Sequence, residues 1–194
     1  LKHEANETFF VNLTNLVDAN FSDSQAQGLI LNDDALPSIS IDDVTHTEGD
    51  SGTQNYVFTV SLSNPSGQTV TVDWFTVDFP PLVGTAKPGT DYVPSVGTLT
   101  FLEDQTTKTI TIQVKGDLKN ENDETFFVQL SNVKNATLGD FLGQGTIVNN
   151  DPVPTLSIDD RRTAERDSGT RAAVHTVTLS QASGKTVTVN YTTV

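Results

Sequence analysis

The sequence predicts an all-β protein, an antiparallel β-sandwich of short strands, and three observations support this fold class. Apolar and polar residues alternate in several short segments, which is the period of a half-buried strand. No segment carries an apolar stripe with helical spacing, and clusters of Gly, Pro, Asn, Asp and Ser separate the segments as turns do. About seven such strands in about 117 residues are typical of an immunoglobulin-like sandwich, a fold that by itself names no function.

The chain repeats itself with an offset of 117 residues. Residues 1–77 align with residues 118–194 without a gap, and roughly half of the aligned positions are identical, which is far above chance for one internal period. The repeat divides the chain into the C-terminal part of one unit (residues 1–35), a complete unit (36–152) and the N-terminal part of a third unit (153–194). A unit of this size can bury a core unaided, so we expect tandem sandwich units.

Each expected strand of the complete unit follows from a local pattern. Ile39 and Ile41 alternate with serine in the first strand, and Val70, Val72 and Trp74 mark the third among β-branched neighbours. Residues 47–52 predict a turn. Three of the eight prolines fall within residues 80–88, so residues 78–96 are expected to form an irregular loop. The expected strands are residues 39–41, 56–62, 70–74, 98–101, 109–114, 125–130 and 145–148.

The two flanking parts repeat some of these strands. Residues 8–13 and 28–31 predict the last two strands of a unit, and residues from 155 onward predict copies of the first three strands. Their apolar faces lack the rest of a sandwich, and unpaired strand edges invite association. We therefore expect contacts between neighbouring repeats. We also expect head-to-tail self-association, in which the C-terminal part of one chain packs with the N-terminal part of another.

The composition argues against several classes of function. The net charge of −14 argues against a nucleic-acid partner, because phosphate binding needs a basic surface. No apolar run approaches the length of a membrane helix, so no membrane insertion is expected. With no cysteine, three histidines and no nucleophile-elbow motif, we expect neither a zinc site nor an enzyme. Paired carboxylates can act as a glycosidase acid and base, which keeps catalysis as the last alternative.

The densest group of acidic residues directly precedes an expected strand. Asp117, Glu121, Asp123 and Glu124 crowd residues 116–124, and Lys119 is the nearby cation. Carboxylates this close repel one another unless a cation sits between them, and the following strand would fix their positions. A hard cation with oxygen ligands suits such a loop, and Ca²⁺ is the first candidate. The alternative is that the acidic residues only keep an extracellular protein soluble.

Five groups of motifs occur in a fixed order along the chain. They are Ser-Ile-Asp-Asp with Thr-Glu-Gly-Asp-Ser-Gly (residues 40–43 and 47–52), Gly-Thr-Asp-Tyr (89–92), Gly-Thr-Leu-Thr-Phe (97–101), Asn-Asp-Glu-Thr-Phe (122–126) and Gly-Thr-Ile-Val-Asn-Asn-Asp (145–151). This order resembles the Calx-β domain, a module of sodium–calcium exchangers, of the integrin beta-4 subunit and of bacterial surface proteins. The resemblance covers the whole middle unit and both partial ones.

The resemblance implies a calcium site in which carboxylates from loops at one end of the sandwich converge. Carried over to the matching positions, the implied ligands are Glu48, Asp91, Asp117, Glu121, Glu124 and Asp151. Calcium-binding members often end the unit with three acidic residues, whereas this chain has two asparagines before Asp151. An amide oxygen can ligate calcium without charge, so Asn150 joins the candidate set, and weaker or fewer ions are expected.

Other roles remain open for some of these acidic residues. Asp91 could instead order a turn, Glu124 could be a solvated strand end, and the pair at 42–43 is expected to be turn or linker acids rather than ligands. In the last partial unit Glu165 takes the position of Glu48. Arginines surround it at 161, 162 and 166, and their expected pairing with carboxylates would leave a poor site there.

The resemblance and the acidic loop together suggest one function and one alternative. We expect a calcium-binding structural module of an extracellular or cell-surface tandem-repeat protein, a secreted protein with bacteria as one source. Its ions would lie at acidic loops near the linker between repeats. The alternative is a β-sandwich spacer or adhesion module that needs no metal, and the two asparagines before Asp151 motivate it.

Overall fold

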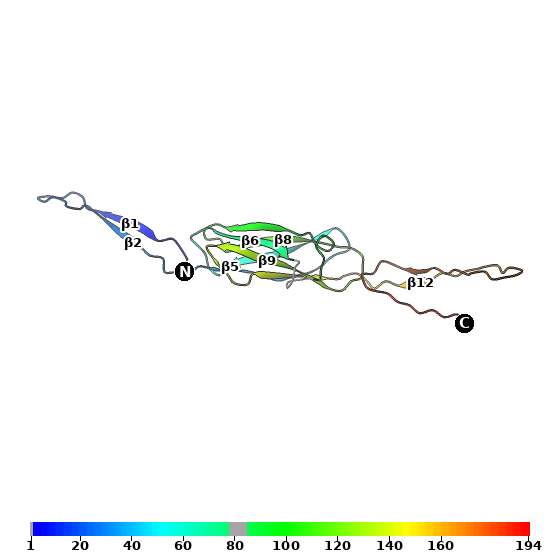
Figure 1. Cartoon of the computed structure of the whole chain (residues 1–194). Coiled ribbons are helices and arrows are strands. Elements are labelled where there is room, and N and C mark those ends of the chain that lie inside the picture. Colours follow the sequence, from blue (N-terminus) through cyan, green and yellow to red (C-terminus); the bar gives the residue numbers. More distant parts are fainter. Residues whose placement is uncertain (1, 78–84) are drawn as a thin grey trace.

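The computed structural model describes residues 2–77 and 85–194, and it forms a central β-sandwich with a hairpin at each end (Figure 1). Within these described ranges there is no helix, and hence none long and apolar enough to cross a membrane. The irregular loop expected at residues 78–96 falls partly outside the described residues. The strands of the central sandwich are β3 (Ser38–Ile41), β4 (Val44–Thr47), β5 (Thr53–Leu62), β6 (Val70–Val77), β7 (Val96–Phe101), β8 (Thr107–Lys115), β9 (Glu124–Lys134), β10 (Thr137–Leu138) and β11 (Leu142–Val148).

The first sheet has the strand order β10-β3-β5-β8. Strand β5 lies at its centre and pairs antiparallel with β8 from Thr53 to Ser61. Alternate residues of β5 are buried, beginning with Tyr56 and Phe58, and alternate residues of β8 oppose them on the same inner face. This two-residue period places one face of each strand in the core, as the sequence pattern predicts.

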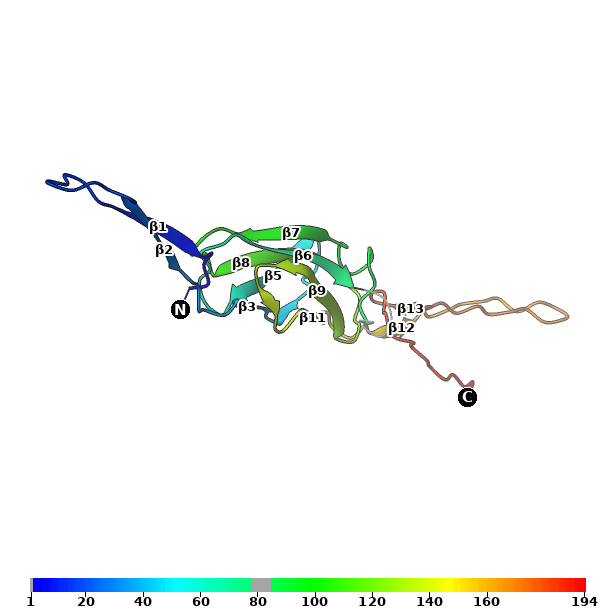
Figure 2. The same cartoon turned by 60° about the vertical axis from the view of Figure 1, so that its left-hand side comes forward.

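The second sheet has the strand order β4-β11-β9-β6-β7 and covers the first (Figure 2). Its longest strand, β9, begins at Glu124 and pairs with both β6 and β11. The all-β sandwich predicted from the sequence is therefore confirmed. Two edge pairings differ from the antiparallel expectation, because β4 pairs parallel with β11 and β10 pairs parallel with β3.

The core between the sheets contains aromatic and branched aliphatic side chains. Phe126 lies at its centre, where Tyr92 stacks on it with ring centroids 4.8 Å apart and Tyr56 and Phe58 approach it at steeper angles. All four aromatic side chains are buried. Burying this much apolar surface is the main stabilising contribution, and it anchors the start of β9, next to the acidic loop.

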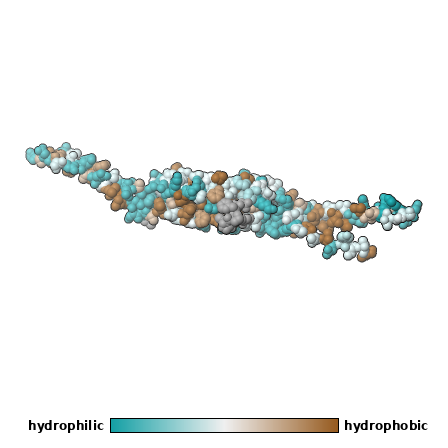
Figure 3. Space-filling view, in the orientation of Figure 1, coloured by the Kyte–Doolittle hydropathy of each residue, from teal (hydrophilic) through white to brown (hydrophobic). Residues whose placement is uncertain are grey.

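Each flanking hairpin repeats a pairing of the central sandwich. Strands β1 (Glu7–Asn12) and β2 (Gln25–Ile30) pair antiparallel, with Glu7 opposite Ile30, in the register that joins Glu124 to Ile147. Strands β12 (Leu156–Ile158) and β13 (Val177–Leu179) pair in the register of β3 with β5. Both hairpins leave apolar surface exposed, as the brown areas on the two arms indicate (Figure 3).

The third strand expected in the last segment does not form. Residues 187–194 match the sequence of β6 but are not assigned to a strand. In the central sandwich β6 lies between β7 and β9 and pairs with both. No strand of the described chain pairs with residues 187–194, and an isolated extended segment has no stable partner for its backbone groups.

Candidate metal centre

Segments from four parts of the sequence meet at the end of the sandwich that faces the last hairpin. Glu48 follows β4, Asp91 lies in the turn before β7, and Asp151 follows β11. Asp117 and Glu121 belong to the loop between β8 and β9, and Glu124 is the first residue of β9. The sandwich topology, rather than closeness in sequence, therefore brings these acidic residues together.

Backbone contacts hold the Glu48 turn against the start of the acidic loop and the end of β11. The Gly116 N–H donates to the carbonyl oxygen of Gly52, at 3.1 Å, and the Glu48 N–H donates to that of Val148, at 3.3 Å. A Cβ at Gly116 would lie 2.2 Å from the carbonyl oxygen of Gly49 and 2.8 Å from that of Glu48. Only glycine allows this approach, because those contacts are to backbone atoms that cannot rotate away.

Three of the predicted ligands form a compact carboxylate group. Asp91, Glu121 and Glu124 each offer an oxygen, and these atoms lie within 4.8 Å of one another. Burial is the main cause that raises the pKa of Glu124 to about 7, followed by its interactions with Asp91 and Glu121. Part of this effect is a hydrogen bond between Glu124 and Asp91. Such a group is stable only if a proton or a cation neutralises some of its charge.

Glu48 faces the same group from the opposite turn. Its side chain is buried, with 7% of the residue exposed. Burial raises its pKa to about 7, and the charges of Asp117, Asp151 and Glu121 contribute in that order. Glu48 therefore interacts electrostatically with the other acidic residues and belongs to the same candidate site.

Asp151 supplies the observation that points most directly to a ligand. It is 5% exposed, and neither of its carboxylate oxygens has a hydrogen-bond partner in the described part of the chain. Burial raises its pKa, with Asp50 and Asp117 adding to the effect. Its backbone carbonyl oxygen accepts hydrogen bonds from the amides of Asn120, at 2.8 Å, and Asn149, at 3.1 Å. The backbone is thus fixed while the carboxylate lacks a partner, which is costly for a buried charge.

Lys119 partly neutralises the acidic loop. Its Nζ lies 3.0 Å from Oδ2 of Asp117, and the Lys119 N–H donates to Oδ1 at 2.7 Å. The hydrogen bond and charge of Asp117 raise the pKa of Lys119, with smaller contributions from Glu121 and Asp91. Among the ion pairs of the described residues, Lys119 is the one cation that pairs with these six carboxylates, so a large negative charge remains at this end and suits a divalent cation.

Asn150 is held by contacts that differ from those expected of a ligand. Its amide oxygen accepts the Gly49 N–H at 3.0 Å, and its amide nitrogen donates to Oδ1 of Asp50 at 2.7 Å. These bonds close the Glu48 turn onto the end of β11. Asp50 acts on the site through this amide and through its charge beside Asp151; the sequence reasoning gave it no role, although it lies two residues after Glu48.

Other acidic residues near the motifs have structural contacts. Oδ1 of Asp42 accepts the Thr59 N–H of β5 at 2.6 Å, and Oδ1 of Asp43 accepts the Gln144 N–H of β11 at 2.7 Å, so both side chains tie the β3–β4 turn to strands distant in sequence. Oδ2 of Asp91 likewise accepts the Lys87 N–H at 2.6 Å, so Asp91 orders its own turn while its carboxylate also faces Glu124.

The last hairpin contains no comparable carboxylate group among the residues described. Glu165 is exposed there, and no ion pair joins the arginines at 161, 162 and 166 to a carboxylate in the described chain. The expected pairing of these arginines is therefore absent. The partner segments that would bring other acidic residues to Glu165 are not present in this hairpin.

The chain is similar to known calcium-binding modules. The family profile of the Calx-beta domain matches residues 32–153, which is more than half of the chain. The structure of CBD12 from CALX1.2 is similar with a TM-score of 0.52 and 23% identity, over 63% of this chain and 49% of that one. The structure of calcium binding domain CBD12 of CALX1.1 is similar with a TM-score of 0.50 and 24% identity, over 57% of this chain and 44% of that one. No curated protein matches the sequence. On the extent of the family match, the chain belongs to the Calx-beta domain family.

Proposed function

We propose that the central unit is a calcium-binding structural module, with the ion held at the acidic end of the sandwich. The observation that carries this proposal is the buried carboxylate of Asp151, whose two oxygens have no partner among the described residues. A buried ionised carboxylate is destabilising unless a cation or hydrogen-bond donors compensate it. Calcium prefers carboxylate and other oxygen ligands, and it accepts irregular geometry.

The proposed ligands come from all four segments that meet at this end. Asp91, Glu121 and Glu124 already lie close enough to share an ion. Glu48 and Asp151 are buried beside Asp117, so each would exchange a costly isolated charge for a metal contact. Asn150 remains a predicted ligand whose amide would first have to leave Gly49. The matched CBD12 structure of CALX1.1 is described as a calcium binding domain, which supports the choice of metal.

Calcium at this position would stabilise the unit and the start of its linker. Asp151 directly precedes the Pro-Val-Pro segment that leads to β12. An ion that joins Asp151 to the loop before β9 would fix where the chain leaves the sandwich. Binding to the folded state adds RT ln(1 + [L]/Kd) to the free energy of unfolding, which is about 2.7 kcal/mol at 100 times Kd.

The proposed setting is a tandem array on the outside of a cell. The hairpins at the two ends reproduce pairings of the central unit in the same register, 117 residues apart, which supports incomplete units at residues 1–35 and 153–194 around the unit at 36–152. An acidic, cysteine-free chain of such units suits a secreted or cell-surface spacer, in which millimolar calcium keeps the array extended. A binding role of this kind is preferred to catalysis.

Calorimetry of chelator-stripped protein tests the proposal. We expect heat on titration with calcium and little or none with magnesium, because magnesium demands a small octahedral site and keeps its water. The double variant Glu121→Gln/Glu124→Gln should lose the calcium heat. The matched control Glu103→Gln/Asp18→Asn removes the same charge from exposed positions and should keep it. Absence of heat at millimolar calcium would contradict the proposal.

A metal-independent spacer or adhesion module is the second candidate. The observation that favours it is the use of Asn150 to close a turn, together with the charge that Lys119 already compensates. In that case Glu121→Gln/Glu124→Gln would raise the melting temperature by relieving repulsion. Calcium would then change the melting temperature of neither the parent protein nor the double variant. A calcium-dependent rise in Tm that the double variant loses would reject this alternative.

A further inference from the structure

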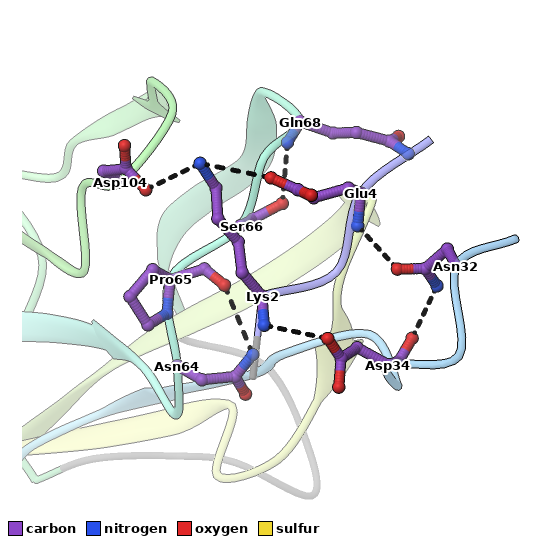
Figure 4. Close-up of polar contacts among 9 residues, drawn as sticks. All are labelled: Lys2, Glu4, Asn32, Asp34, Asn64, Pro65, Ser66, Gln68 and Asp104. Carbon is purple, nitrogen blue, oxygen red and sulfur yellow. Dashed lines mark hydrogen bonds and ion pairs between the residues drawn. The ribbon is translucent and has the colours of Figure 1, made fainter. Parts of the chain in front are cut away.

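The leading hairpin, β1–β2 with residues 2–6 before it, contacts the central unit through a short backbone pairing, beside which Lys2 reaches Asp104 of the central unit (Figure 4). His3 forms a parallel bridge with Ser66, in the turn between β5 and β6, and the Gly67 N–H donates to the His3 carbonyl oxygen at 2.9 Å. Lys2 lies over this contact, with its Nζ 2.9 Å from Asp104 of the central unit and 3.4 Å from Glu4. Ser66 is only 2% exposed.

The same pairing recurs between the central unit and the last hairpin, 117 residues further along. Asn120 forms a parallel bridge with Ser183, and the Gly184 N–H donates to the Asn120 carbonyl oxygen at 3.2 Å. The side chains at the paired positions differ, since histidine in one place corresponds to asparagine in the other. A backbone pairing that survives such exchanges is set by the main-chain path rather than by one side chain.

The segments whose carbonyl oxygens accept these bonds, around His3 and Asn120, are held by equivalent hydrogen bonds. The His3 ring nitrogen Nδ1 lies 2.8 Å from the carbonyl oxygen of Asp34, as the Asn120 amide lies 2.8 Å from that of Asp151. Asn32 and Asn149 then play equivalent parts. The Glu4 N–H donates to the Asn32 amide oxygen at 2.9 Å, and the Glu121 N–H donates to the Asn149 amide oxygen at 2.9 Å. Each contact therefore rests on a preorganised loop.

The glycine of the donating turn lies against a glutamate side chain of the preceding segment in both places. A Cβ at Gly67 would lie 2.7 Å from Cγ of Glu4, and a Cβ at Gly184 would lie 2.4 Å from Cγ of Glu121. The Ser-Gly pair of the turn thus packs directly against the acidic loop of the preceding unit in both places. The contact is between the turn and a glutamate side chain, and neither glycine has a left-handed backbone.

We propose that consecutive units dock through this one recurring contact, which we call the inter-unit joint. In the joint, the Ser-Gly turn between the second and third main strands of a unit pairs with the acidic-loop backbone of the unit before it. The partner that fits the acidic end is therefore another unit of this kind. Glu121 belongs both to the joint and to the proposed calcium site, so the following unit forms one wall beside that site.

The joint concerns the same loop as the proposed function but does not require an ion, and the two ideas can fail separately. The His3–Ser66 and Asn120–Ser183 pairings consist of backbone bonds that exist whether or not the carboxylates are neutralised. Distances measured in chelator therefore test the joint. If calcium titration gives no heat but the distance distributions across the joint are narrow, the proposed calcium binding is wrong and the joint is supported. If calcium binds but the distance distributions are broad, the joint is wrong and the proposed calcium binding is supported.

Electron–electron distance measurements on spin-labelled protein give the test, and the absence of native cysteine keeps the labelling specific. One protein carries Thr8→Cys and Ser61→Cys across the first joint. A second protein carries Thr125→Cys and Thr178→Cys, the positions 117 residues later, across the second joint. We expect narrow distance distributions in chelator with the same mean for both pairs. Broad distributions, or two clearly different means, would overturn the proposal.

Two kinds of variant show whether the pairing itself fixes the orientation. Gly67→Pro removes the N–H donor of the first joint and should broaden the distribution there at least twofold, while the second joint keeps its width. Gly184→Pro should broaden the distribution at the second joint and leave the width at the first joint unchanged, so each variant is the control for the other. Asp104→Asn removes the carboxylate that pairs with Lys2. Asparagine tolerates the positive φ of 64° at this position, so the turn itself should not change.

The charge variant provides an independent readout that does not alter the turn. At low ionic strength Asp104→Asn should broaden the first distribution, and Glu103→Gln, which removes an exposed neighbouring charge, should leave it unchanged. The melting temperature of the central unit monitors folding in every case. If Gly67→Pro and Asp104→Asn both leave the first distribution as narrow as before, the joint does not set the orientation and the proposal is wrong.

Discussion

At the scale of single residues, the carboxylate of Asp151 is the buried acidic group of this end that lacks hydrogen-bond partners among the described residues. Asn120 and Asn149 bind its carbonyl oxygen and hold its backbone in place, while both carboxylate oxygens are buried without a partner in the described chain. The side chain therefore cannot reach water by a small backbone adjustment. Burial and repulsion between the carboxylates disfavour their ionised forms and raise the pKa values at this end, so without a metal some of these groups bind protons near pH 7.

Glu48 gives the first prediction at this scale. Glu48→Gln removes a buried charge that lies beside Asp117 and Asp151, so at pH 8 without calcium we expect the free energy of unfolding to rise by about 1 to 3 kcal/mol. With saturating calcium the same variant should be less stable than the parent, because a ligand is lost. Urea titrations with and without calcium measure both effects. Glu103→Gln is the exposed control, and a fall in calcium-free stability of Glu48→Gln would contradict the prediction.

The second prediction at the residue scale concerns pH. Burial raises the pKa of Glu48 and of Glu124 from 4.5 to about 7, so between these values the folded state binds more protons than the unfolded state. The stability conferred by these shifts is therefore fully present below pH 4.5 and is lost as pH rises through 7, in the absence of calcium. Denaturant titrations at pH 5, 6, 7 and 8 in chelator measure this loss.

Calcium should reverse that dependence, because the metal needs ionised carboxylates. Its affinity should rise between pH 5 and 8, and binding at pH 6 should release protons. Calorimetry at pH 6 in two buffers with different ionisation enthalpies measures the release as a difference in heat. Equal heats in the two buffers at pH 6 would show that Glu48 and Glu124 were already ionised, against the prediction.

At the scale of the elements, the approach of β8 to the β4–β5 turn positions the site. Gly116 directly follows β8, and glycine is the only kind of residue that fits there against the backbone of Glu48 and Gly49. We predict that Gly116→Ala costs about 1 to 3 kcal/mol of stability, since the strain falls on backbone atoms, and that it weakens calcium affinity by moving Glu48. Thr109→Ala, on the exposed face of the same strand, is the control. An unchanged calcium affinity would show that the turn adapts independently.

The strands of the central sandwich were largely predictable from local pattern, and the errors have a common cause. Residues 56–62 and 125–130 alternate strongly because one face of each is buried, so their pattern survives in the sequence. Strand β4 was not predicted, because its four residues follow two turn acids and its partner, β11, lies about a hundred residues away. Residues 187–194 carry the pattern of β6 without its neighbours and form no strand. Pairing between distant segments decides these cases, and a local pattern does not record it.

The candidate site was predictable to a similar degree. The crowding of carboxylates at residues 117–124 identified the loop without any structure. Glu48, Asp91 and Asp151 came only from the resemblance to the family, because the topology that brings them to the loop is not visible in their own surroundings. The contacts of Asn150 with Gly49 and Asp50 depend on side-chain orientation, which no spacing in the sequence specifies.

At the scale of the whole molecule, the central sandwich and the two hairpins lie in a row (Figure 1). The negative charge of the chain lies within residues 1–152, where the acidic groups repel one another at low ionic strength, whereas residues 153–194 carry five Lys and Arg against four Asp and Glu. If calcium binds between the loops of the central unit, the melting temperature of the protein should rise. We predict a Tm rise of several degrees at millimolar calcium, absent for Glu121→Gln/Glu124→Gln and retained in Glu103→Gln/Asp18→Asn. Differential scanning calorimetry measures the shift, and no shift in the parent protein would contradict it.

The exposed apolar faces of the hairpins give the last prediction. Phe9 and Val177 are 51% and 50% exposed, whereas Phe126 and Val60, 117 residues away at equivalent positions, are fully buried between the two sheets. Because such faces are the inner surfaces of a sandwich, we propose that the 194-residue chain associates head to tail, the last segment of one copy covering the β1–β2 hairpin of another.

In that arrangement residues 187–194 would pair with β1 as β6 pairs with β9, which supplies the strand neighbour they lack within the described chain. We expect the sedimentation coefficient to increase with protein concentration over the micromolar range. Val177→Lys should abolish the increase, because a buried ammonium without a partner would oppose assembly. Val96→Lys, at a 79% exposed position on β7 that lies outside these faces, should leave it intact. A chain that stays monomeric at every concentration would show that the two faces do not meet in this way.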